Sequence, residues 1–573
     1  MNKKNIILSI NPIAHDTAAA LMIDGEIVSA CEQERYTKDK HSRKFPIDAA
    51  LSCLDSAEVT IEDLTLVVVP YDVKKGVREY YLKNAIIDDA RLEFLVDDID
   101  RVKHLLTLEQ TIKENLGYEG EVKFVDHHMS HMSSAYYTSG YKDALVVSYD
   151  GLGEIDTMGI SVAKNGDLQL CENDNKYPQS LGLLYAAVTN YLGWKYASDE
   201  GIVMGLASYG NPDETIPGDS ISYYEAFEEI IEITGDYTFN IDFPNWMNFY
   251  NVRDAWVGKK FLDTFGPKRH GDGELTQHHK NIASALQKRI EEIVIHQLTA
   301  AKKKYNQSNL CISGGVGLNC SLNGKILSSN LFDNIYVVPP SGDPGTNIGA
   351  CFLGYQYLGN SVEIKKRHNF YLGSKYDDDK IKDVLDSYNS SYKYSENICL
   401  EAAKIIEKGN IIGWFQGSAE FGPRALGNRS ILAKPYPASM KDHVNKRIKF
   451  REEFRPFAPA VLHEFYTDYF DMKQESPHML MAVKVRESAK DSIAATVHID
   501  GSARVQTVKQ SNNLPFWNLL KEFDKLTGIP VLLNTSFNVK GQPVVNSPED
   551  AIQTFYDTNL DYLIIGDYLV SKT

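Results

Sequence analysis

A pair of histidines four residues apart is the first feature of this sequence that could do chemistry. His127 and His131 stand in the segment DHHMSHMSSA, and on a helix this spacing places both imidazoles on one face, where they can chelate one divalent ion. Asp150 ends the apolar segment LVVSYD, where a buried carboxylate is costly unless it is paired or metal-bound. Asp343 lies in the expected strand-to-helix turn SGDPGTN. Two imidazoles with two carboxylates suit iron, zinc or manganese better than calcium or magnesium. For an isolated pair of this spacing, a histidine-rich surface helix is the alternative.

Two glycine-rich turns follow expected strands. The turn GGVGLN contains Gly314, Gly315 and Asn319, and the turn DGLGE contains Gly151 beside Asp150. Glycine lets backbone amides approach a nucleotide closely, and the N-terminus of a following helix favours negative charge. Either turn alone commonly means only a tight turn. Together with the histidine pair they predict a nucleotide site beside the metal ligands.

His15 and Asp16 interrupt an apolar strand pair near the N-terminus. A neutral imidazole at this place could act as a general base and take the proton of an acceptor hydroxyl near pH 7. A hydrogen-bonded core histidine is the alternative. The sequence leaves both interpretations open.

A run of basic residues between 424 and 455 stands out in an otherwise acidic chain. It contains Arg424, Arg429, Lys434, Lys441, Lys446, Arg447, Lys449, Arg451 and Arg455. A solvated basic face is the usual explanation of such a run. Here the cations alternate with Phe, Pro and Gly, which favours a pocket, and arginine forks match phosphate geometry. Later segments add His498, Arg504, Ser536 and Asn538. The pattern predicts a site for anionic substrates.

Strand and helix patterns alternate in a way typical of layered α/β proteins. Strands are expected at NIILSIN, TAAALMID and EIVSACEQE, helical spacing runs from about 76 to 117, and DALVVSYDG and TMGISVAKNGDL read as a hairpin. A basic linker, EIKKRH, spans 363–368. We therefore expect one domain at 1–362 and a second at 363–573.

Composition limits the partners and the compartment. The chain has 573 residues, a formal net charge of −17 and a pI of about 5.4, and so acidic a surface repels a phosphate backbone. Nucleic acid is therefore not expected as a partner. Seven cysteines without a CxxC pair indicate reduced thiols in the cytoplasm. No stretch approaches the ~20 apolar residues of a membrane span.

The chain resembles, over nearly its whole length, the carbamoyltransferase family of the nodulation-protein-U and antibiotic O-carbamoyltransferase type. The segments that carry this resemblance are AHDTAAALMIDG, DHHMSHMSSA, YDGLGE, MGLASYG, SGGVGLN, GDPGTNIGA, EFGPRALGNRSIL, KFREEFRPFAP and LLNTSFN. The resemblance implies an N-terminal domain with the actin-like ATPase-superfamily (ASKHA) fold and a C-terminal YrdC-like α/β domain. It also implies that the second domain makes carbamoyl adenylate from carbamoyl phosphate and ATP with Mg²⁺. The first domain then transfers the carbamoyl group to a hydroxyl of a small natural-product acceptor.

The resemblance also assigns roles to particular residues. A divalent ion, expected to be Fe²⁺, would be bound by His127, His131, Asp150 and Asp343. His15, with Asp16, would lie at the transfer site. The anionic substrates would meet Arg424, Lys449, Arg451, Arg455, His498, Arg504, Ser536 and Asn538. Nucleotide contacts in the transfer domain would come from Gly151, Gly314, Gly315 and Asn319.

The sequence departs from the family pattern at four positions. Ile202 stands where a lysine is common and Ser418 where an arginine is common, while Lys434 and Tyr436 replace an aspartate and an arginine. These departures leave adenylate chemistry in place but say nothing about the acceptor. Residues 244–256 (PNWMNFYNVRDAW) are one candidate for contact with it.

Two other functions stay open at this point. A tRNA threonylcarbamoyl-adenosine-type enzyme uses the same two folds, and a nucleotide-binding regulator could use the actin-like fold alone. The acidic surface argues against the tRNA-modifying enzyme, because it repels a nucleic acid. The predicted anion pocket of the C-terminal domain argues against the regulator, because a regulator does not need it. A homodimer is also left open.

Overall fold

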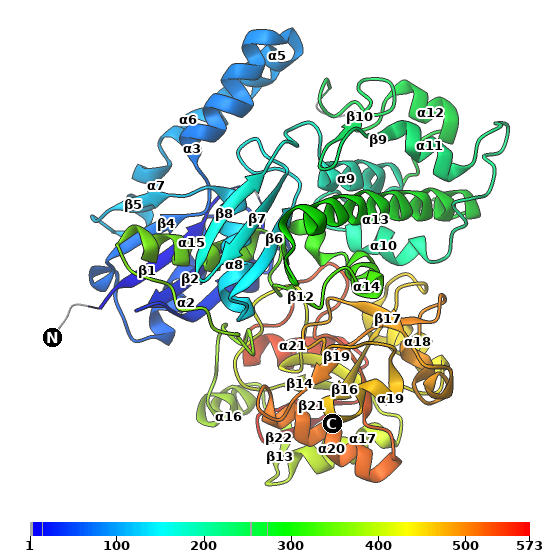
Figure 1. Cartoon of the computed structure of the whole chain (residues 1–573). Coiled ribbons are helices and arrows are strands. Elements are labelled where there is room, and N and C mark those ends of the chain that lie inside the picture. Colours follow the sequence, from blue (N-terminus) through cyan, green and yellow to red (C-terminus); the bar gives the residue numbers. More distant parts are fainter. Residues whose placement is uncertain (1–3, 14, 253–254, 272, 573) are drawn as a thin grey trace. The chain divides into compact units, whose positions relative to one another are not determined.

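The computed structural model describes every residue except 1–3, 14, 253–254, 272 and 573. The chain divides into two compact units. Unit 1 comprises Met1–Val28, Phe45–Ala50 and Glu58–Arg367, and unit 2 comprises Ser29–Lys44, Leu51–Ala57 and His368–Thr573 (Figure 1).

Two five-stranded sheets organise unit 1. The strand orders are β3-β2-β1-β4-β5 and β12-β11-β6-β7-β8. The strands of the first sheet are β1 (Ile6–Asn11), β2 (Ala18–Ile23), β3 (Glu26–Glu32), β4 (Leu66–Val69) and β5 (Val122–Phe124). Those of the second are β6 (Asp143–Tyr149), β7 (Met158–Lys164), β8 (Asp167–Glu172), β11 (Asn309–Ser313) and β12 (Asn334–Val337). In the first sheet β1 is antiparallel to β2 and parallel to β4, which is parallel to β5. In the second sheet β7 is antiparallel to β6 and β8, while β11 is parallel to β6 and β12.

Helices α8 (His127–Ser139) and α15 (Asp343–Tyr357) pack against one another, and each also packs on strands of the sheets. Gly349 of α15 permits this approach, since a Cβ atom there would lie 1.7 Å from the carbonyl oxygen of Ser130. Any larger residue would push the helices apart. The two helices carry three of the expected metal ligands, so this contact fixes their separation.

The remaining elements of unit 1 form a helical arm and a helical insert. The arm contains α3 (Val73–Gly76), η2 (Val77–Lys83), α4 (Asn84–Ile87), α5 (Asp89–Asp97), α6 (Ile99–Leu106) and α7 (Leu108–Leu116). The insert and its continuation contain α9 (Leu181–Tyr191), α10 (Glu200–Ala207), α11 (Tyr223–Ile230), β9 (Ile231–Ile233), β10 (Phe239–Ile241), α12 (Lys259–Phe265), α13 (Gln277–Tyr305), η3 (Gly315–Leu318) and α14 (Cys320–Ser329). The helical spacing expected over 76–117 and the hairpin of β6 and β7 are confirmed.

Unit 2 is built on an eight-stranded sheet in the order β13-β22-β21-β14-β15-β20-β16-β19. Its strands are β13 (Ser391–Tyr394), β14 (Ile412–Phe415), β15 (Arg429–Ala433), β16 (Ala458–Leu462), β19 (Gln506–Val508), β20 (Val531–Ser536), β21 (Tyr562–Ile565) and β22 (Tyr568–Ser571). Strands β17 (Ala482–Lys484) and β18 (Ser502–Arg504) form a separate pair. Alternate side chains enter two cores: Leu532 belongs to one and Leu533 to the other.

Helices cover both faces of this sheet. One core includes side chains of α17 (Ile398–Glu407) and α20 (Leu514–Thr527). The other includes side chains of α16 (Asp378–Ser387), α18 (Ser439–Val444), η4 (Asn445–Lys449) and α21 (Pro548–Asp557). The short helix α19 (Tyr466–Tyr469) follows β16 and the 3-10 turn η5 (His463–Phe465), and the 3-10 turns η6 (Glu487–Ala489) and η7 (Asp491–Thr496) precede β18. The α/β class expected from the sequence is confirmed.

A segment near the N-terminus forms part of unit 2. It includes α1 (Glu34–Thr37) and the second half of α2 (Ile47–Ser56), while the 3-10 turn η1 (Ile61–Asp63) already belongs to unit 1. Buried Arg35 donates to the Gly422 carbonyl at 3.1 Å, and the Gly422 amide donates to Glu32 at 2.7 Å. Arg35 and Glu32 also form a buried ion pair. Unit 2 is therefore discontinuous in sequence.

The structure bears on two expectations, one about membrane-spanning helices and one about the cysteines. Within the described residues, no helix is long and apolar enough to cross a membrane. All seven cysteines lie in the described part of the chain, and none of them forms a disulfide.

Candidate metal centre and anion pocket

The four expected metal ligands lie together in unit 1. Ligand atoms of His127, His131, Asp150 and Asp343 are all within 4.8 Å of one another. His127 Nε2 lies 3.3 Å from Asp150 Oδ2 and 3.7 Å from Asp343 Oδ1. His131 Nε2 lies 3.8 and 3.7 Å from the same two oxygens. Both imidazoles are buried. The cluster has the donor set of an N/O site for a transition metal.

The hydrogen bonds of the ligand residues to neighbouring backbone groups favour metal binding. His127 Nδ1 lies 3.2 Å from the carbonyl oxygen of Pro70, and donation of its proton there leaves Nε2 with a lone pair for a cation. Asp150 Oδ1 accepts from the Gly315 amide at 2.8 Å, so Oδ2 stays available. Neither ring nitrogen of buried His131 has a hydrogen-bond partner among the described residues. Such an orphaned buried group calls for a ligand, and the four residues therefore fit a divalent ion.

Electrostatics point the same way. Burial lowers the pKa of His127, but the hydrogen bond to Asp150 and the charges of Asp343 and Asp150 outweigh it and raise the pKa to about 10. Burial raises the pKa of Asp150, yet the hydrogen bond from His127 and the positive charges that His127 and His131 can carry hold it well below its usual range. The carboxylates of Asp150 and Asp343 therefore favour positive charge in the cluster. A divalent cation supplies this charge and can replace the imidazole proton.

A buried network supports the N-terminus of α8, which carries His127. Glu154 Oε1 accepts from the backbone amides of His127 (3.0 Å) and Asp72 (2.6 Å). Lys75 Nζ lies 2.7 Å from both Asp126 and Asp156 and 3.8 Å from Glu154. Asp126 also accepts from the Met129 amide and caps the helix.

This network was not foreseen from the sequence. The motif DGLGE contains Glu154, but its spacing gave no sign that the carboxylate would reach the amide of His127. Burial and the nearby Asp126 raise the pKa of Glu154 to about 7, against the opposing effects of His127 and Lys75. Glu154 and Lys75 orient a ligand without belonging to the ligand set.

His15 lies near this cluster. Its Nδ1 is 2.7 Å from Asp16 Oδ2, and the two side chains are 31% and 21% exposed. Burial lowers the pKa of His15, but the hydrogen bond to Asp16 and the charges of Asp16, Asp343 and Asp150 raise it to about 9. The backbone of Asp16 has a positive φ of 58°, a strained conformation for a non-glycine residue. The pair is oriented by this hydrogen bond and is partly open to solvent, and its part in proton transfer stays a prediction.

The glycine-rich turns lie beside the cluster. Gly314 has φ +86°, and a Cβ atom there would lie 2.1 Å from the Tyr149 carbonyl oxygen, so only glycine fits. The Gly315 amide is committed to Asp150. Gly151 stands next to that ligand, and its carbonyl accepts from Ser180 Oγ at 2.7 Å. Asn319 caps α14 through the Leu322 amide and pairs with Gln287. The turns thus pack against Tyr149 and Asp150 at the end of β6 and help to hold the Asp150 carboxylate in place. Contact of these turns with a nucleotide stays a prediction.

In unit 2, Lys449 is the centre of the expected anion pocket. This buried ammonium donates to Ser536 and Asn538, with Nζ 2.5 and 3.0 Å from their carbonyl oxygens and 3.2 and 2.7 Å from Ser536 Oγ and Asn538 Oδ1. Burial first, then the charges of Arg451, Arg455 and Lys40, hold its pKa well below the usual range. A buried lysine with cationic neighbours and neutral partners favours an anion.

Other expected residues surround it. Arg451 donates to Asn445 Oδ1 at 3.0 Å and to the Pro456 carbonyl at 3.1 Å, and burial with Arg455 and Arg504 holds its pKa well below the usual range. Burial lowers the pKa of His498 to about 4, helped by Arg504. Arg455 lies 3.6 Å from Glu452. The structure therefore brings together Lys449, Arg451, Arg455, Arg504, Ser536 and Asn538, while Arg424 is half-buried in the loop that precedes β15.

Not every cation of the basic run belongs to this pocket. Buried Arg429 donates to backbone carbonyls, including that of Gln416 at 2.6 Å, and its guanidinium lies 3.6 Å from the Phe415 ring centroid. Arg447 pairs with Asp561. Lys434 lies over the ring of Tyr436 at 5.3 Å, so two of the departures from the family pattern contact each other.

Lys40 is a cation that sequence reasoning missed. It comes from the N-terminal segment of unit 2, about 400 positions before Lys449, and its charge acts on that ammonium. The neighbouring Lys38 pairs with Asp550 at the start of α21. The only sequence signal was the cluster of basic residues in KDKHSRK, which has no motif context of its own.

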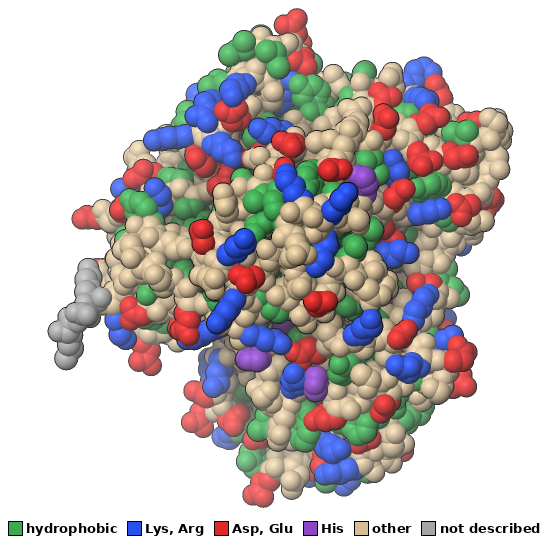
Figure 2. All heavy atoms as spheres, viewed as in Figure 1, with side chains coloured by type: hydrophobic (Ala, Val, Ile, Leu, Met, Phe, Trp, Pro, Cys, Tyr) green, Lys and Arg blue, Asp and Glu red, His purple; other side chains and the backbone are tan. Residues whose placement is uncertain are grey.

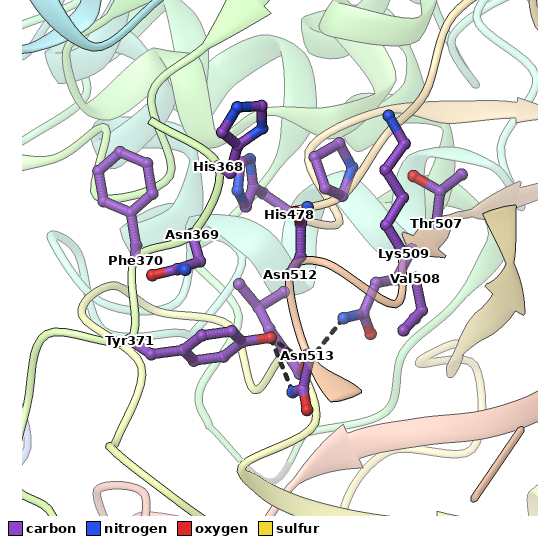
Figure 3. Close-up of a pocket in the computed structure, with 13 residues that line it drawn as sticks. His368, Asn369, Phe370, Tyr371, His478, Thr507, Val508, Lys509, Asn512 and Asn513 are labelled. Carbon is purple, nitrogen blue, oxygen red and sulfur yellow. Dashed lines mark hydrogen bonds between the residues drawn. The ribbon is translucent and has the colours of Figure 1, made fainter. Parts of the chain in front are cut away.

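Figure 3 shows a small pocket elsewhere in unit 2, lined by residues of the segments 368–371, 477–478 and 506–513, together with Leu426. Its polar lining is already engaged: Asn513 donates to Tyr371 at 3.0 Å and Gln506 to the Leu426 carbonyl at 2.8 Å. None of the expected site residues is among the described residues that line it. Residues 253–254 of the candidate acceptor segment lie outside the described residues.

An α/β protein with a buried His/Asp cluster in one unit and a buried cation pocket in the other is the class that fold and site define. Family profiles identify it further. The profile "Carbamoyltransferase N-terminus" matches residues 6–352, and "Carbamoyltransferase C-terminus" matches residues 403–572. The chain therefore belongs to the carbamoyltransferase family and is a carbamoyltransferase.

Individual relatives agree with this assignment. An uncharacterized protein of Synechocystis sp. is 35% identical, over 99% of this chain and 97% of its own. Nodulation protein NolNO of Sinorhizobium fredii is 35% identical, over 98% and 80%, and nodulation protein U of Rhizobium tropici is 29% identical, over 92% and 90%. Among solved structures, HypF of T. kodakarensis matches 62% of this chain and 48% of its own at 13% identity, with a TM-score of 0.30. A likeness of that size does not establish a common function.

Proposed function

We propose that this carbamoyltransferase forms carbamoyl adenylate from carbamoyl phosphate and ATP in unit 2 and transfers the carbamoyl group to a hydroxyl of a small acceptor in unit 1. The observation that carries the proposal is the buried, cation-surrounded Lys449, in a chain that belongs to the carbamoyltransferase family. Buried cations of this density are costly without an anion. Two phosphorylated substrates supply that anionic partner.

In unit 2 the residues bind and align the two anions. Lys449 and Arg451 are held by backbone and amide oxygens, so their charges are preorganised rather than free to follow solvent. Arg455 and Arg504 add planar forks suited to phosphoryl oxygens. The chemistry joins a carbamate oxygen to the α-phosphorus of ATP and breaks the bond to pyrophosphate. Release of phosphate from carbamoyl phosphate consumes one water, which completes the atom balance.

In unit 1, neutral His15 takes the proton of the acceptor hydroxyl at Nε2, while Asp16 accepts from its Nδ1. The charges of Asp16, Asp343 and Asp150 keep the imidazole protonated near pH 7 in the metal-free chain, and the positive charge of a metal ion held by the cluster would offset them and favour the neutral form. The attacking oxygen forms a bond to the carbamoyl carbon, and AMP leaves with the electrons of the broken C–O bond. His127, His131, Asp150 and Asp343 would hold a divalent metal, for which we propose iron. Such an ion would supply Lewis-acid stabilisation of negative charge on the adenylate.

The experiment that tests this function uses the full chain with ATP and carbamoyl phosphate, without an acceptor. Mass spectrometry should detect carbamoyl adenylate, and pyrophosphate should appear only when carbamoyl phosphate is present. Formation of ADP in place of pyrophosphate would contradict the proposal, because it would show transfer of the γ-phosphoryl group.

A further inference from the structure

A tight turn in unit 2 holds a histidine, an aspartate and a serine together. The backbone amide of His498 donates to the Ser502 carbonyl at 2.8 Å, and the Gly501 amide donates to the His498 carbonyl at 2.9 Å. Gly501 has a φ of +77°, which suits glycine at the end of such a turn. Arg504 ends β18 two residues after Ser502, and β18 pairs with β17. The turn and the pocket cation Arg504 therefore belong to one short hairpin.

The hydrogen bonds of the turn fix the position of the proton on the imidazole. Ser502 Oγ lies 2.7 Å from Asp500 Oδ1 and 3.1 Å from His498 Nδ1. Burial raises the pKa of Asp500, but the bonds from the Ser502 hydroxyl and amide hold it below its usual value. The ionised carboxylate can only accept, so the single hydroxyl proton of Ser502 goes to it. His498 Nδ1 then donates to Ser502, and Nε2 carries the lone pair.

This lone pair is buried without a donor. The Nε2 atom of His498 has no hydrogen-bond partner within the part of the chain that the structure describes. Burial and the charges of Arg504 and Lys441 lower the pKa of the imidazole to about 4, against the opposing charge of Asp500. The ring is therefore neutral near pH 7. A buried acceptor without a donor is costly, so the position calls for a molecule that donates a proton.

The lone pair lies beside the buried cations of unit 2. The charge of Arg504 lowers the pKa of both His498 and Arg451, and the charge of Arg451 lowers that of Lys449. Figure 2 shows basic and acidic side chains interspersed on the face in view, so cations there have counter-charges nearby. Lys449 and Arg451 instead donate to neutral oxygens. An anion bound by these cations would lie close to a proton acceptor.

Binding of such an anion also strengthens the acceptor. An anion beside Arg504 offsets the charge that lowers the pKa of His498, so this pKa rises toward neutrality. A base works best when its pKa lies near the working pH. The imidazole therefore becomes a better base when the anionic substrate is in place.

The cleavage of carbamoyl phosphate needs a group of this kind. The water that releases phosphate loses a proton when its oxygen bonds to carbon. The arginines of the pocket have no lone pair, and Lys449 Nζ already donates to oxygens of Ser536 and Asn538. His498 Nε2 offers the lone pair that the step requires.

We propose that His498 is the general base that activates water for the cleavage of carbamoyl phosphate in unit 2. This inference rests on the proposed function. His498 Nε2 takes one proton of the water, whose oxygen forms a bond to the carbonyl carbon. The bond between that carbon and the phosphate oxygen breaks, and phosphate leaves with the electron pair and receives the proton from Nε2. The second proton is lost to solvent as carbamic acid ionises, and the carbamate oxygen then attacks the α-phosphorus of ATP.

The test compares two donors in the full chain, carbamoyl phosphate and ammonium carbamate, each with ATP. His498→Asn removes Nε2, while its new NH2 group can still donate to Ser502. With carbamoyl phosphate, this variant should form carbamoyl adenylate about 10²–10⁴-fold more slowly than the wild type, as is typical on loss of a general base. With carbamate it should match the wild type, because no water has to be activated.

His443→Asn is the matched control, since His443 of α18 is exposed and its ring contacts Arg447. It should form carbamoyl adenylate from both donors like the wild type. In water labelled with heavy oxygen, the phosphate released by the wild type should stay unlabelled, because the bond to carbon breaks.

Four results would overturn the inference alone: an undiminished rate of His498→Asn with carbamoyl phosphate, an equal loss with both donors, a wild type that cannot use carbamate, or labelled phosphate. A wild type that forms no carbamoyl adenylate from carbamoyl phosphate would contradict the proposed function, and the inference with it.

Discussion

Removing the charge of Glu154 should weaken metal binding although Glu154 is not a ligand. Both backbone amides donate to Oε1, so in Glu154→Gln the remaining oxygen keeps these bonds only if the new NH2 group takes the place of Oε2. In that place the NH2 group faces Lys75, whose Nζ lies 3.8 Å from Oε2. Two donors then oppose each other in a buried place. The side chain must turn, and the amides of His127 and Asp72 lose their shared acceptor at 3.0 and 2.6 Å.

The expected loss is about 10- to 100-fold in metal affinity, which is the usual effect of losing a group that orients a ligand. This corresponds to about 1.4–2.7 kcal/mol. The assay is competition with a chelator of known affinity, first for Fe²⁺ and then for Zn²⁺. Glu109→Gln is the control, because Glu109 is 52% exposed and pairs only with Lys113 among the described residues.

A thermal unfolding curve of the metal-free Glu154→Gln chain separates misfolding from a local effect. Metal affinity equal to that of the wild type in a folded variant would refute the reasoning, since it would show that His127 is oriented without Glu154.

Three further outcomes are expected. His127→Ala should lower the metal content of the purified chain sharply by elemental analysis, and unchanged content would remove the metal centre from the account. Lys40→Ala should raise the KM for carbamoyl phosphate or ATP at least several-fold, whereas Lys44→Ala, in the same segment, should not; equal KM values in both would exclude Lys40 from the pocket. Phosphate or carbamoyl phosphate binding should take up protons, because an anion raises the low pKa of Lys449, so affinity should fall as pH rises. Calorimetry in buffers of different ionisation enthalpy measures this uptake, and proton release would contradict it.

Of all the site features, the metal centre could be predicted best from the sequence. The spacing of His127 and His131 and the strand-end position of Asp150 are local signals, so their convergence could be predicted. The approach of Asp343 depends on the contact of α15 with α8 at Gly349, which the turn SGDPGTN only suggested. Glu154 could not be predicted, because its role rests on a contact with the backbone of a residue 27 positions away.

The basic run shows the opposite limit. The basic run contains Arg429 and Arg447 as well as Lys449, and the sequence did not show which of its cations share a pocket. In the structure Arg429 binds backbone carbonyls and Arg447 binds Asp561. Lys40 was missed because a discontinuous unit brings distant segments together. A single expected boundary near 362 divides the chain once, so it could not assign residues 29–44 and 51–57 to unit 2. Local spacing therefore predicts motifs well, whereas long-range contacts decide which cations share a pocket.

The division of labour between the two units is tested most directly by measuring carbamoyl adenylate formed from ATP and carbamoyl phosphate in two variants of the full chain. His15→Asn should still form the adenylate and fail in transfer, with a loss of about 10²–10⁴-fold, typical for a general base. Arg455→Ala should not form it. Loss of adenylate formation in a correctly folded His15→Asn chain, or its survival in Arg455→Ala, would contradict the assignment of activation to unit 2 and transfer to unit 1.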